Sequence, residues 1–351
     1  MSVFINSAFD DHERVLFCRD ARLGLSAIIA IHSTALGPAA GGARQWTYAN
    51  SDEALYDVLR LSQGMSYKNA MAGLKFGGGK AVIIQHDDFK PTNALYERFG
   101  EFVDTLHGDY ITAEDVGMTP AIMESIARRT QYVTGLPSLG DKAGGDPSPK
   151  TAYGIFCGIR AAVAHKFDRS SLDGVSVAVQ GVGNVGYHLC RLLSDAGATL
   201  IISDIDKLKV DRVCDEFGAE KAALDEILFL DADVVAPCAL GAVFNKTTIG
   251  KLRAKIIAGG ANNQLETFAD GRRLRDAEVL YAPDYVINGG GIINVACEYY
   301  GDVDDAGVFK LVERIGPRLE RIFKEADARQ MPTNEVADEQ AKKIIRDAAD
   351  D

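Results

Sequence analysis

The stretch VSVAVQGVGNVGYHL at 175–189 decides the fold of the second half of the chain. A short apolar run is followed by glycines at the spacing G-x-G-x-x-G and then by a helical pattern, the order of a strand, a tight turn and a helix. The glycines permit the turn, the approach of a pyrophosphate and the packing of the helix on the strand. Asp204 closes the next apolar run, where its carboxylate can bind ribose hydroxyls, and no arginine directly follows it. The stretch therefore predicts a dinucleotide site for NAD rather than NADP.

Strand and helix patterns alternate around this motif. Apolar runs predict strands at 175–180, 199–203, 233–236, 256–258 and 279–281, with helices beginning at Asn184 and Lys207. Alternation of this kind predicts a parallel sheet wound by helices. The expected fold class is α/β with two domains, an N-terminal α/β domain and a C-terminal Rossmann-type, doubly wound domain.

The first half of the chain mixes strands, helices and glycine runs. Strands are predicted at 14–19, 25–32, 81–84 and 110–112, and helices at 51 to about 68, 91–106 and 120–128. Glycine runs at 37–42 and 76–80 are predicted to be loops. Lys68 is expected at or just past the end of its helix.

A punctuated segment separates the two halves. Residues 134–150 hold several glycines and prolines without any periodicity, so we place the domain boundary there. The first domain is predicted to cover 1–136 and the second 137–326. A helical C-terminal segment, about 327–351, is expected to pack back on the first domain.

Composition excludes several classes of protein. The chain has 351 residues, a net charge of −12 and 47% hydrophobic residues, so neither nucleic acid nor an anionic membrane surface is an expected partner. No apolar run approaches the roughly 20 residues of a membrane span, and residues 1–10 lack the basic start of a secretory signal. We therefore expect a cytoplasmic protein. Six scattered cysteines without a C-x-x-C pair predict neither a disulfide framework nor a metal site.

Two lysines and one acid are candidate catalytic residues. The GGGK run at 77–80 lacks the first glycine and the Ser/Thr of a phosphate-binding loop, so an ATPase is not indicated. Lys80 is the last residue of this run, Lys68 precedes the run by nine residues, and Asp115 lies in TAEDVG at 112–117. Neighbouring ammonium groups and burial disfavour the charged form, so one lysine can act as a base while the other holds a carboxylate. The alternative is that the lysines are solvated or pair with Glu114.

Nine motifs occur along the chain: LGPAAGG at 36–42, MSYK at 65–68, GGGK at 77–80, TAEDVG at 112–117, PSPKTA at 147–152, GVGNVG at 181–186, APCA at 236–239, ANN at 261–263 and YAPDYVIN at 281–288. Together they resemble the Glu/Leu/Phe/Val dehydrogenase family, and specifically its leucine, valine, phenylalanine and tryptophan dehydrogenase branch. The resemblance covers nearly the whole chain. It implies reversible oxidative deamination of an L-amino acid to its 2-oxo acid and ammonium, with NAD as cofactor, in a homo-oligomer, a dimer or an octamer.

The resemblance also implies a role for particular residues. Lys68 would bind the substrate carboxylate, Lys80 would activate the attacking water, and Asp115 would exchange protons with the amino group. The substrate would contact Ala40, Gly41, Gly42, Met65, Lys68, Ala113, Asn262, Ile292 and Val295. The cofactor would contact Thr151, Gly181, Gly183, Asn184, Val185, Gly186, Asp204, Cys238, Ala239 and Asn262. No residue is expected to bind a metal.

The implied side-chain pocket is apolar. Because Ala40, Ala113, Ile292 and Val295 offer no partner for a second carboxylate, glutamate is disfavoured and leucine, valine or isoleucine is favoured. An aromatic substrate remains an alternative, because Ala40 stands at a position where leucine dehydrogenases often carry a larger side chain. Phe76 and Gly289 also depart from the family pattern. Further alternatives are a catalytically silent NAD-binding relative and a hydroxy-acid dehydrogenase. A hydroxy-acid dehydrogenase would need a histidine paired with an acid beside the nicotinamide, and none of the six histidines falls in a motif.

Overall fold

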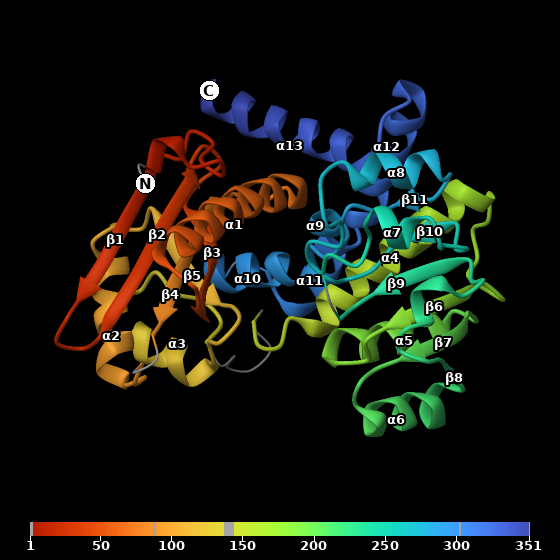
Figure 1. The fold of residues 1–351 in the computed structure, drawn as a ribbon, viewed down its shortest axis with the longest axis horizontal. Coiled ribbons are helices and arrows are strands. Elements are labelled where there is room, and N and C mark those ends of the chain that lie inside the picture. The colour runs from red at the N-terminus through yellow and green to blue at the C-terminus, as the bar shows by residue number, and fades with distance from the viewer. Residues whose placement is uncertain (1–2, 87–88, 137–143, 240, 302, 351) are drawn as a thin grey trace. The chain divides into compact units, whose positions relative to one another are not determined.

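The computed structural model describes residues 3–86, 89–136, 144–239, 241–301 and 303–350. The chain forms two compact units (Figure 1). The first consists of Met1–Gly145, Val295–Asp304 and Ala341–Asp351, and the second of Asp146–Asn294 and Asp305–Gln340. The predicted domain boundary at 136/137 adjoins residues 137–143, which lie outside the described part of the chain. We therefore retain the predicted domain limits as a proposal.

The first unit is built on a mixed five-stranded sheet. Its strand order is β1 (Arg14–Asp20), β2 (Leu25–Ser33), β4 (Gly77–Gln85), β3 (Ala39–Thr47) and β5 (Tyr110–Glu114). β1, β2 and β4 pair antiparallel, whereas β4, β3 and β5 pair parallel. Apolar side chains alternate between two faces of the sheet. One face packs on α1 (Ser51–Ala72), and the other packs on α2 (Asn93–Asp104) and α3 (Pro120–Ala127).

Both glycine runs of the first half are strands, so the prediction of loops there was wrong. β3 begins at Ala39 and includes Gly41 and Gly42, and β4 begins at Gly77, which places Lys80 inside a strand. Lys68 also lies within α1 rather than at its end, because the helix continues to Ala72. Glycine is disfavoured in strands by local preference. Here it is selected by contact, since a Cβ on Gly78 would overlap the backbone of Ser66 on α1.

The second unit contains a fully parallel six-stranded sheet. Its order is β11 (Leu280–Tyr281), β10 (Ile256–Ile257), β9 (Val234–Pro237), β6 (Ser176–Gln180), β7 (Thr199–Ser203) and β8 (Glu220–Lys221). The strand order reverses between β6 and β9, as in a doubly wound dinucleotide-binding domain. This confirms the predicted fold class. The carboxyl ends of β6 and β9, where such domains bind ligands, lead into Gly181 and Cys238.

Helices and short turns complete the fold. They are η1 (Val3–Ile5), η2 (Ile227–Phe229), α4 (Ser148–Phe167), α5 (Asn184–Asp195), α6 (Lys207–Phe217), α7 (Lys246–Ile249), α8 (Asp270–Asp276), α9 (Asp284–Ile287), α10 (Gly290–Tyr300), α11 (Asp305–Val312), α12 (Ile315–Arg329) and α13 (Thr333–Asp350). The C-terminal segment is two helices, because Gln330 adopts φ +56° and Pro332 follows. Within the described residues, no helix is both long and apolar enough to cross a membrane.

Candidate active site

The structure brings Lys80 and Asp115 into direct contact. Lys80 lies in the middle of β4, and Asp115 directly follows β5. Their Nζ and Oδ2 atoms are 2.7 Å apart, and only 7% of the Lys80 side chain is exposed. This brings together two of the predicted catalytic residues, which are 35 positions apart in the sequence. The partner of Lys80 in this ion pair is Asp115, the residue that follows the alternative partner Glu114.

Asp115 receives a second cation that sequence reasoning missed. Arg44 Nε donates to the same Oδ2 atom at 3.2 Å, and Arg44 Nη1 donates to Asp57 Oδ2 at 3.1 Å. Tyr48 donates its hydroxyl proton to Asp57 Oδ2 at 2.8 Å. Arg44 follows Gly41-Gly42 by two residues, and the alternation of a strand at 39–47 would have placed it on the same face as Gly42. This alternation was not used, because residues 37–42 were predicted to be a loop.

Burial and charge set the protonation of this pair. Burial lowers the pKa of Lys80, Asp115 opposes that effect, and the Arg44 charge adds to it, leaving the pKa below its ordinary value. Burial raises the pKa of Asp115, but the charges of Lys80 and Arg44 outweigh it and bring the pKa below its usual value. A buried lysine with a lowered pKa beside an ionised carboxylate is suited to general acid–base chemistry.

Gly42 lies beside Asp115, and Gly41, Met65 and Lys68 belong to the same unit. A Cβ on Gly42 would lie 2.8 Å from the Asp115 Cβ, and one on Gly41 would lie 3.1 Å from Met65 Cγ. Lys68 is half-buried on α1, three residues after Met65. The buried Asn69 donates from Nδ2 to the carbonyl of Gly77 at 2.6 Å, which ties this end of α1 to the strand that carries Lys80.

An apolar cluster adjoins the two glycines on the same face of the sheet. In the parallel pairing of β3 and β5, Ala113 lies opposite Gly42 and Ile111 lies opposite Ala40. Ala40 and Ile111 are buried together with Phe76 and Ala296. The site therefore passes from charged groups at Asp115 to apolar groups at Ala40. Phe76, which departs from the family pattern, forms part of that apolar end.

The last two predicted pocket residues lie on α10. Ile292 is buried and Val295 is half-buried, and their spacing of three residues places them on one side of the helix. Ile292 belongs to the second unit and Val295 to the first.

The glycine loop of the second unit fits a pyrophosphate. Gly181 has φ +91°, and a Cβ on Gly186 would overlap the carbonyl of Gly181, so both positions require glycine. A Cβ on Gly183 would meet no atom within 4 Å, and Gly183 is the N-cap of α5 without a side-chain capping bond. The helix therefore presents unpaired N–H groups toward open space. Gly183 and Asn184 line a hollow of about 290 Å³ that is also lined by Lys209 and Arg212.

The other predicted cofactor residues of this unit surround the loop. Asp204 Oδ2 accepts a hydrogen bond from the backbone N–H of Val182 at 2.8 Å, so the acid holds the glycine loop and retains acceptor capacity for a ribose. Cys238 donates its backbone N–H to the carbonyl of Gln180 at 2.7 Å, and Ala239 is the residue that a Cβ on Gly181 would touch. Burial raises the pKa of the Cys238 thiol to about 11, so it is a neutral neighbour. Val185 follows Asn184 in the first turn of α5.

Asn262 lies in an anchored loop of the second unit. Its Oδ1 accepts from Asn288 Nδ2 at 2.7 Å, which leaves its amide N–H groups to face a ligand. Gln264 donates to the carbonyls of Gly259 and Ala261. Asn288 and Gln264 are thus positioning residues that sequence reasoning did not find.

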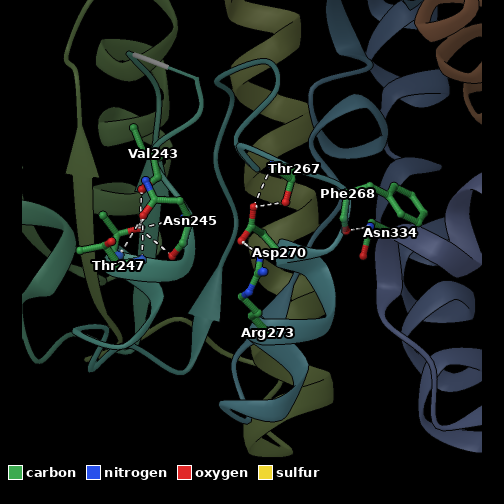
Figure 2. A network of polar contacts seen from close by, with 9 residues as sticks. Val243, Asn245, Thr247, Thr267, Phe268, Asp270, Arg273 and Asn334 are labelled. Atoms are coloured by element: carbon green, nitrogen blue, oxygen red, sulfur yellow. Dashed lines mark hydrogen bonds and ion pairs between the residues drawn. The ribbon is translucent and has the colours of Figure 1, made fainter. Parts of the chain in front are cut away.

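Segments on both sides of this loop are fixed by polar contacts (Figure 2). Asn245 caps α7, and Thr267 donates to the buried Asp270 at the start of α8. Asn334 on α13 donates to the carbonyl of Phe268 at 3.2 Å. These contacts join the segment that follows the loop at 259–264 to α8 and α13.

Thr151 lies in the first turn of α4. Its hydroxyl donates to the carbonyl of Pro147 at 3.0 Å, and a Cβ on Gly291 would lie 2.8 Å from its Oγ1. The start of α4 and the start of α10 are therefore in contact. In the described residues, no three side chains of His, Cys, Asp or Glu are grouped to hold a metal ion.

A parallel doubly wound sheet with an open glycine loop, together with a buried lysine–aspartate pair, defines the class as a two-unit α/β oxidoreductase. Residues 12–132 match the family described as Glu/Leu/Phe/Val dehydrogenase, dimerisation domain. Residues 146–207 and 203–349 match Glutamate/Leucine/Phenylalanine/Valine dehydrogenase. The chain belongs to this Glu/Leu/Phe/Val dehydrogenase family, and it is an amino acid dehydrogenase.

Individual relatives agree over almost the full length. The leucine dehydrogenase of Geobacillus stearothermophilus is 50% identical over 95% of this chain and 91% of its own. An L-tryptophan dehydrogenase of Nostoc punctiforme is 47% identical over 93% of this chain and 91% of its own. The crystal structure of L-tryptophan dehydrogenase from Nostoc punctiforme superposes with a TM-score of 0.86 at 44% identity, over 97% of each chain. The chain thus resembles enzymes named for an aliphatic and for an aromatic amino acid.

Proposed function

We propose that this amino acid dehydrogenase uses NAD for the reversible oxidative deamination of an apolar L-amino acid, with leucine, valine or isoleucine preferred. The amino acid, water and NAD⁺ give the 2-oxo acid, ammonium, NADH and a proton. The observation that carries the proposal is the buried contact of 2.7 Å between Lys80 and Asp115, with Gly42 packed closely beside Asp115.

Each catalytic residue has a task in this proposal. Lys68 holds the substrate carboxylate by charge. Lys80, whose pKa burial lowers, accepts a proton from the water whose oxygen attacks the imino carbon. Asp115 exchanges protons with the amino nitrogen, which leaves as ammonium. In this arrangement Gly41, Gly42 and Met65 contact the substrate, and Asn262 donates hydrogen bonds to substrate and nicotinamide.

The cofactor assignment is supported by the glycine loop and by Asp204. NAD, when bound, takes the hydride from the α-carbon of the amino acid. The N-terminus of α5 with Gly181, Gly183, Asn184, Val185 and Gly186 would hold its pyrophosphate, and Asp204 would bind the ribose. Thr151, Cys238 and Ala239 would complete the site. A carboxylate at Asp204 repels the extra phosphate of NADP, which favours NAD.

The apolar lining supports an aliphatic substrate. A second carboxylate would be desolvated among Ala40, Ala113 and Ile111 without a cation, so glutamate is disfavoured. The small Ala40 suggested a roomy wall that could admit an aromatic side chain. Phe76, fully buried in the same cluster, fills space beside Ala40 and supports the shorter, branched side chains.

A homo-oligomer, either a dimer or an octamer, is part of the proposal. It is supported by the match of residues 12–132 to a domain described as a dimerisation domain. The cytoplasmic location stays a prediction from the sequence.

The decisive test is NADH oxidation by the purified protein with branched-chain, aromatic and acidic 2-oxo acids, each with and without ammonium. Ammonium-dependent turnover that is fastest with a branched-chain oxo acid is expected. Fastest turnover with an aromatic oxo acid would move the preference to phenylalanine or tryptophan. Turnover without ammonium would indicate a hydroxy-acid dehydrogenase, and NADH binding without any turnover would indicate a silent relative.

A further inference from the structure

We propose that Arg44, braced by Asp57 and Tyr48, is a positioning residue that holds the Asp115 carboxylate against Lys80. This inference rests on the proposed function, because it concerns the same Lys80–Asp115 pair. It adds three side chains that touch neither substrate nor cofactor in that proposal.

The geometry of Arg44 is that of a bridge. Its Nε donates to Asp115 Oδ2 at 3.2 Å, and its Nη1 donates to Asp57 Oδ2 at 3.1 Å. A guanidinium group is planar, and its donors have fixed directions, so one arginine can hold two carboxylates at a fixed separation. Lys80 Nζ and Arg44 Nε both use Oδ2 of Asp115, which fixes the rotation of that carboxylate. A lysine at position 44 has one ammonium group and cannot reproduce both contacts.

The bridge is itself anchored. Asp57 lies on α1 and accepts from Tyr48 at 2.8 Å and from Arg60 Nη2 at 3.2 Å. The side chains of Arg44 and Asp57 are 23% and 18% exposed, so their charges are partly withdrawn from water. Charge-assisted bonds in such surroundings are stronger and more directional than on an open surface. The chain of contacts therefore connects α1, β3 and the end of β5 through one set of charges.

Arg44 and Asp57 have opposite electrostatic effects on the pKa of Lys80. The charged groups that act on it are Asp115 after β5, Arg44 on β3 and Asp57 on α1. The same packed elements also carry Lys68, Glu114 and, on β2, His32, which the test leaves unchanged. The positive Arg44 lowers the pKa of Lys80, and the negative Asp57 raises it. Removing Arg44 should therefore raise this pKa, and removing the charge of Asp57 should lower it.

The test compares Arg44→Met, Arg44→Lys, Asp57→Asn and Tyr48→Phe with the unchanged enzyme. Arg44→Met should lower kcat by about 10- to 100-fold, because a general base displaced by an ångström loses that much, with the KM for NAD unchanged. The acidic limb of the kcat–pH profile for oxidative deamination should move to higher pH in Arg44→Met and to lower pH in Asp57→Asn, because Lys80 acts as a base only when it has lost its proton. Arg44→Lys should keep the limb near its original pH and still lose kcat. Arg60→Met is the matched control, because Arg60 donates to Oδ1 of Asp57 whereas Arg44 donates to Oδ2, and it should leave kcat within a factor of about two.

A second readout does not depend on turnover. The Nζ resonance of Lys80, in protein labelled with ¹⁵N-lysine and assigned by its loss in Lys80→Met, should titrate at higher pH in Arg44→Met and at lower pH in Asp57→Asn. Shifts in the same direction, or none in folded variants, would overturn the inference. If the unchanged protein gave no ammonium-dependent turnover, the proposed function would fail while this titration still decided the role of Arg44. If Arg44→Met did not fold, Asp57→Asn would still test the direction of the shift, and Arg44→Lys would still test the loss of kcat.

Discussion

The two glycine runs, GGGK at 77–80 in the first unit and GVGNVG at 181–186 in the second, look alike in the sequence and serve opposite purposes. The first is a buried strand, where a Cβ on Gly78 would overlap the backbone of Ser66. The second is a turn, where a Cβ on Gly183 would meet nothing within 4 Å. In the first run the absent side chain lets a helix approach a strand. In the second it leaves space for a ligand.

This difference explains where the chemical groups lie. The close contact of α1 with β4 buries Lys80 and brings Asp57 and Arg44 toward Asp115. The open turn exposes the N-terminus of α5. The first run thus builds a site by exclusion of water, whereas the second builds one by leaving backbone donors unpaired.

The largest expected effect is on catalysis by Lys80 in the first run, without any effect on cofactor binding by the second run. Lys80→Ala should lower kcat by about 10³-fold, because it removes the base that activates water. NADH binding, measured by fluorescence titration, should be unchanged, since the second unit is not altered. The exposed Lys343→Ala serves as the control. A Lys80→Ala enzyme with nearly normal kcat would show that another group is the base.

The glycines themselves provide the next comparison. Gly78→Ala should lower the free energy of unfolding by about 3 kcal/mol, because the new methyl group forces α1 away from β4. Gly183→Ala should unfold at the same urea concentration as the unchanged protein and raise the KM for NAD about tenfold. Equal stability losses in the two variants would contradict the distinction between a packing glycine and a binding glycine.

Phe76, which precedes the first glycine run, provides a test of substrate specificity. Phe76→Ala should raise the ratio of kcat/KM for phenylpyruvate to that for 4-methyl-2-oxopentanoate about tenfold, because it opens space beside Ala40. Using the ratio within one variant cancels any loss of stability. Ala40→Leu should change the same ratio in the opposite direction, and an unchanged ratio in both variants would remove this wall from the pocket.

The smallest expected effect is on the pH dependence of stability, through the histidines that contact α1 beside the first glycine run. Ser66, which lies against Gly78, shares a hydrogen bond of 2.7 Å with His32, whose ring contacts His12. Burial lowers the pKa of His12 from 6.5 to about 4 in the folded state. Between these values the unfolded chain binds more protons, so the free energy of unfolding should fall as the pH falls, by up to roughly 3 kcal/mol.

Urea unfolding at about pH 7 and about pH 4.5 measures this dependence. His12→Gln should show a smaller decrease than the unchanged protein, because the titrating ring is gone. An equal decrease in both proteins would assign the acid sensitivity to other groups, such as the ring of His32, whose pKa burial also lowers from 6.5.

Sequence and structure differ most in the first unit. The motif at 181–186, the strands around it and Asp204 were predicted from the sequence, and the structure places them together at the reversal of the strand order. Residues 39–42 and 77–80, which begin β3 and β4, were predicted as loops, because glycine has a low local preference for strands. The bridge of Arg44 was missed for the same reason, since its contacts depend on the pairing of β3 with β5.

By itself the sequence determined the dinucleotide motif, the alternation that defines the second domain and the residue types of the acid–base pair, because these are properties of short segments. Only the tertiary structure decided that Lys80 is buried against Asp115, that Arg44 pairs with both Asp115 and Asp57, and that Phe76 is buried in one cluster with Ala40. These contacts join residues from β3, β4, β5 and α1. Their energies exist only when the strands have paired and the helix has packed on them, so no local pattern can report them.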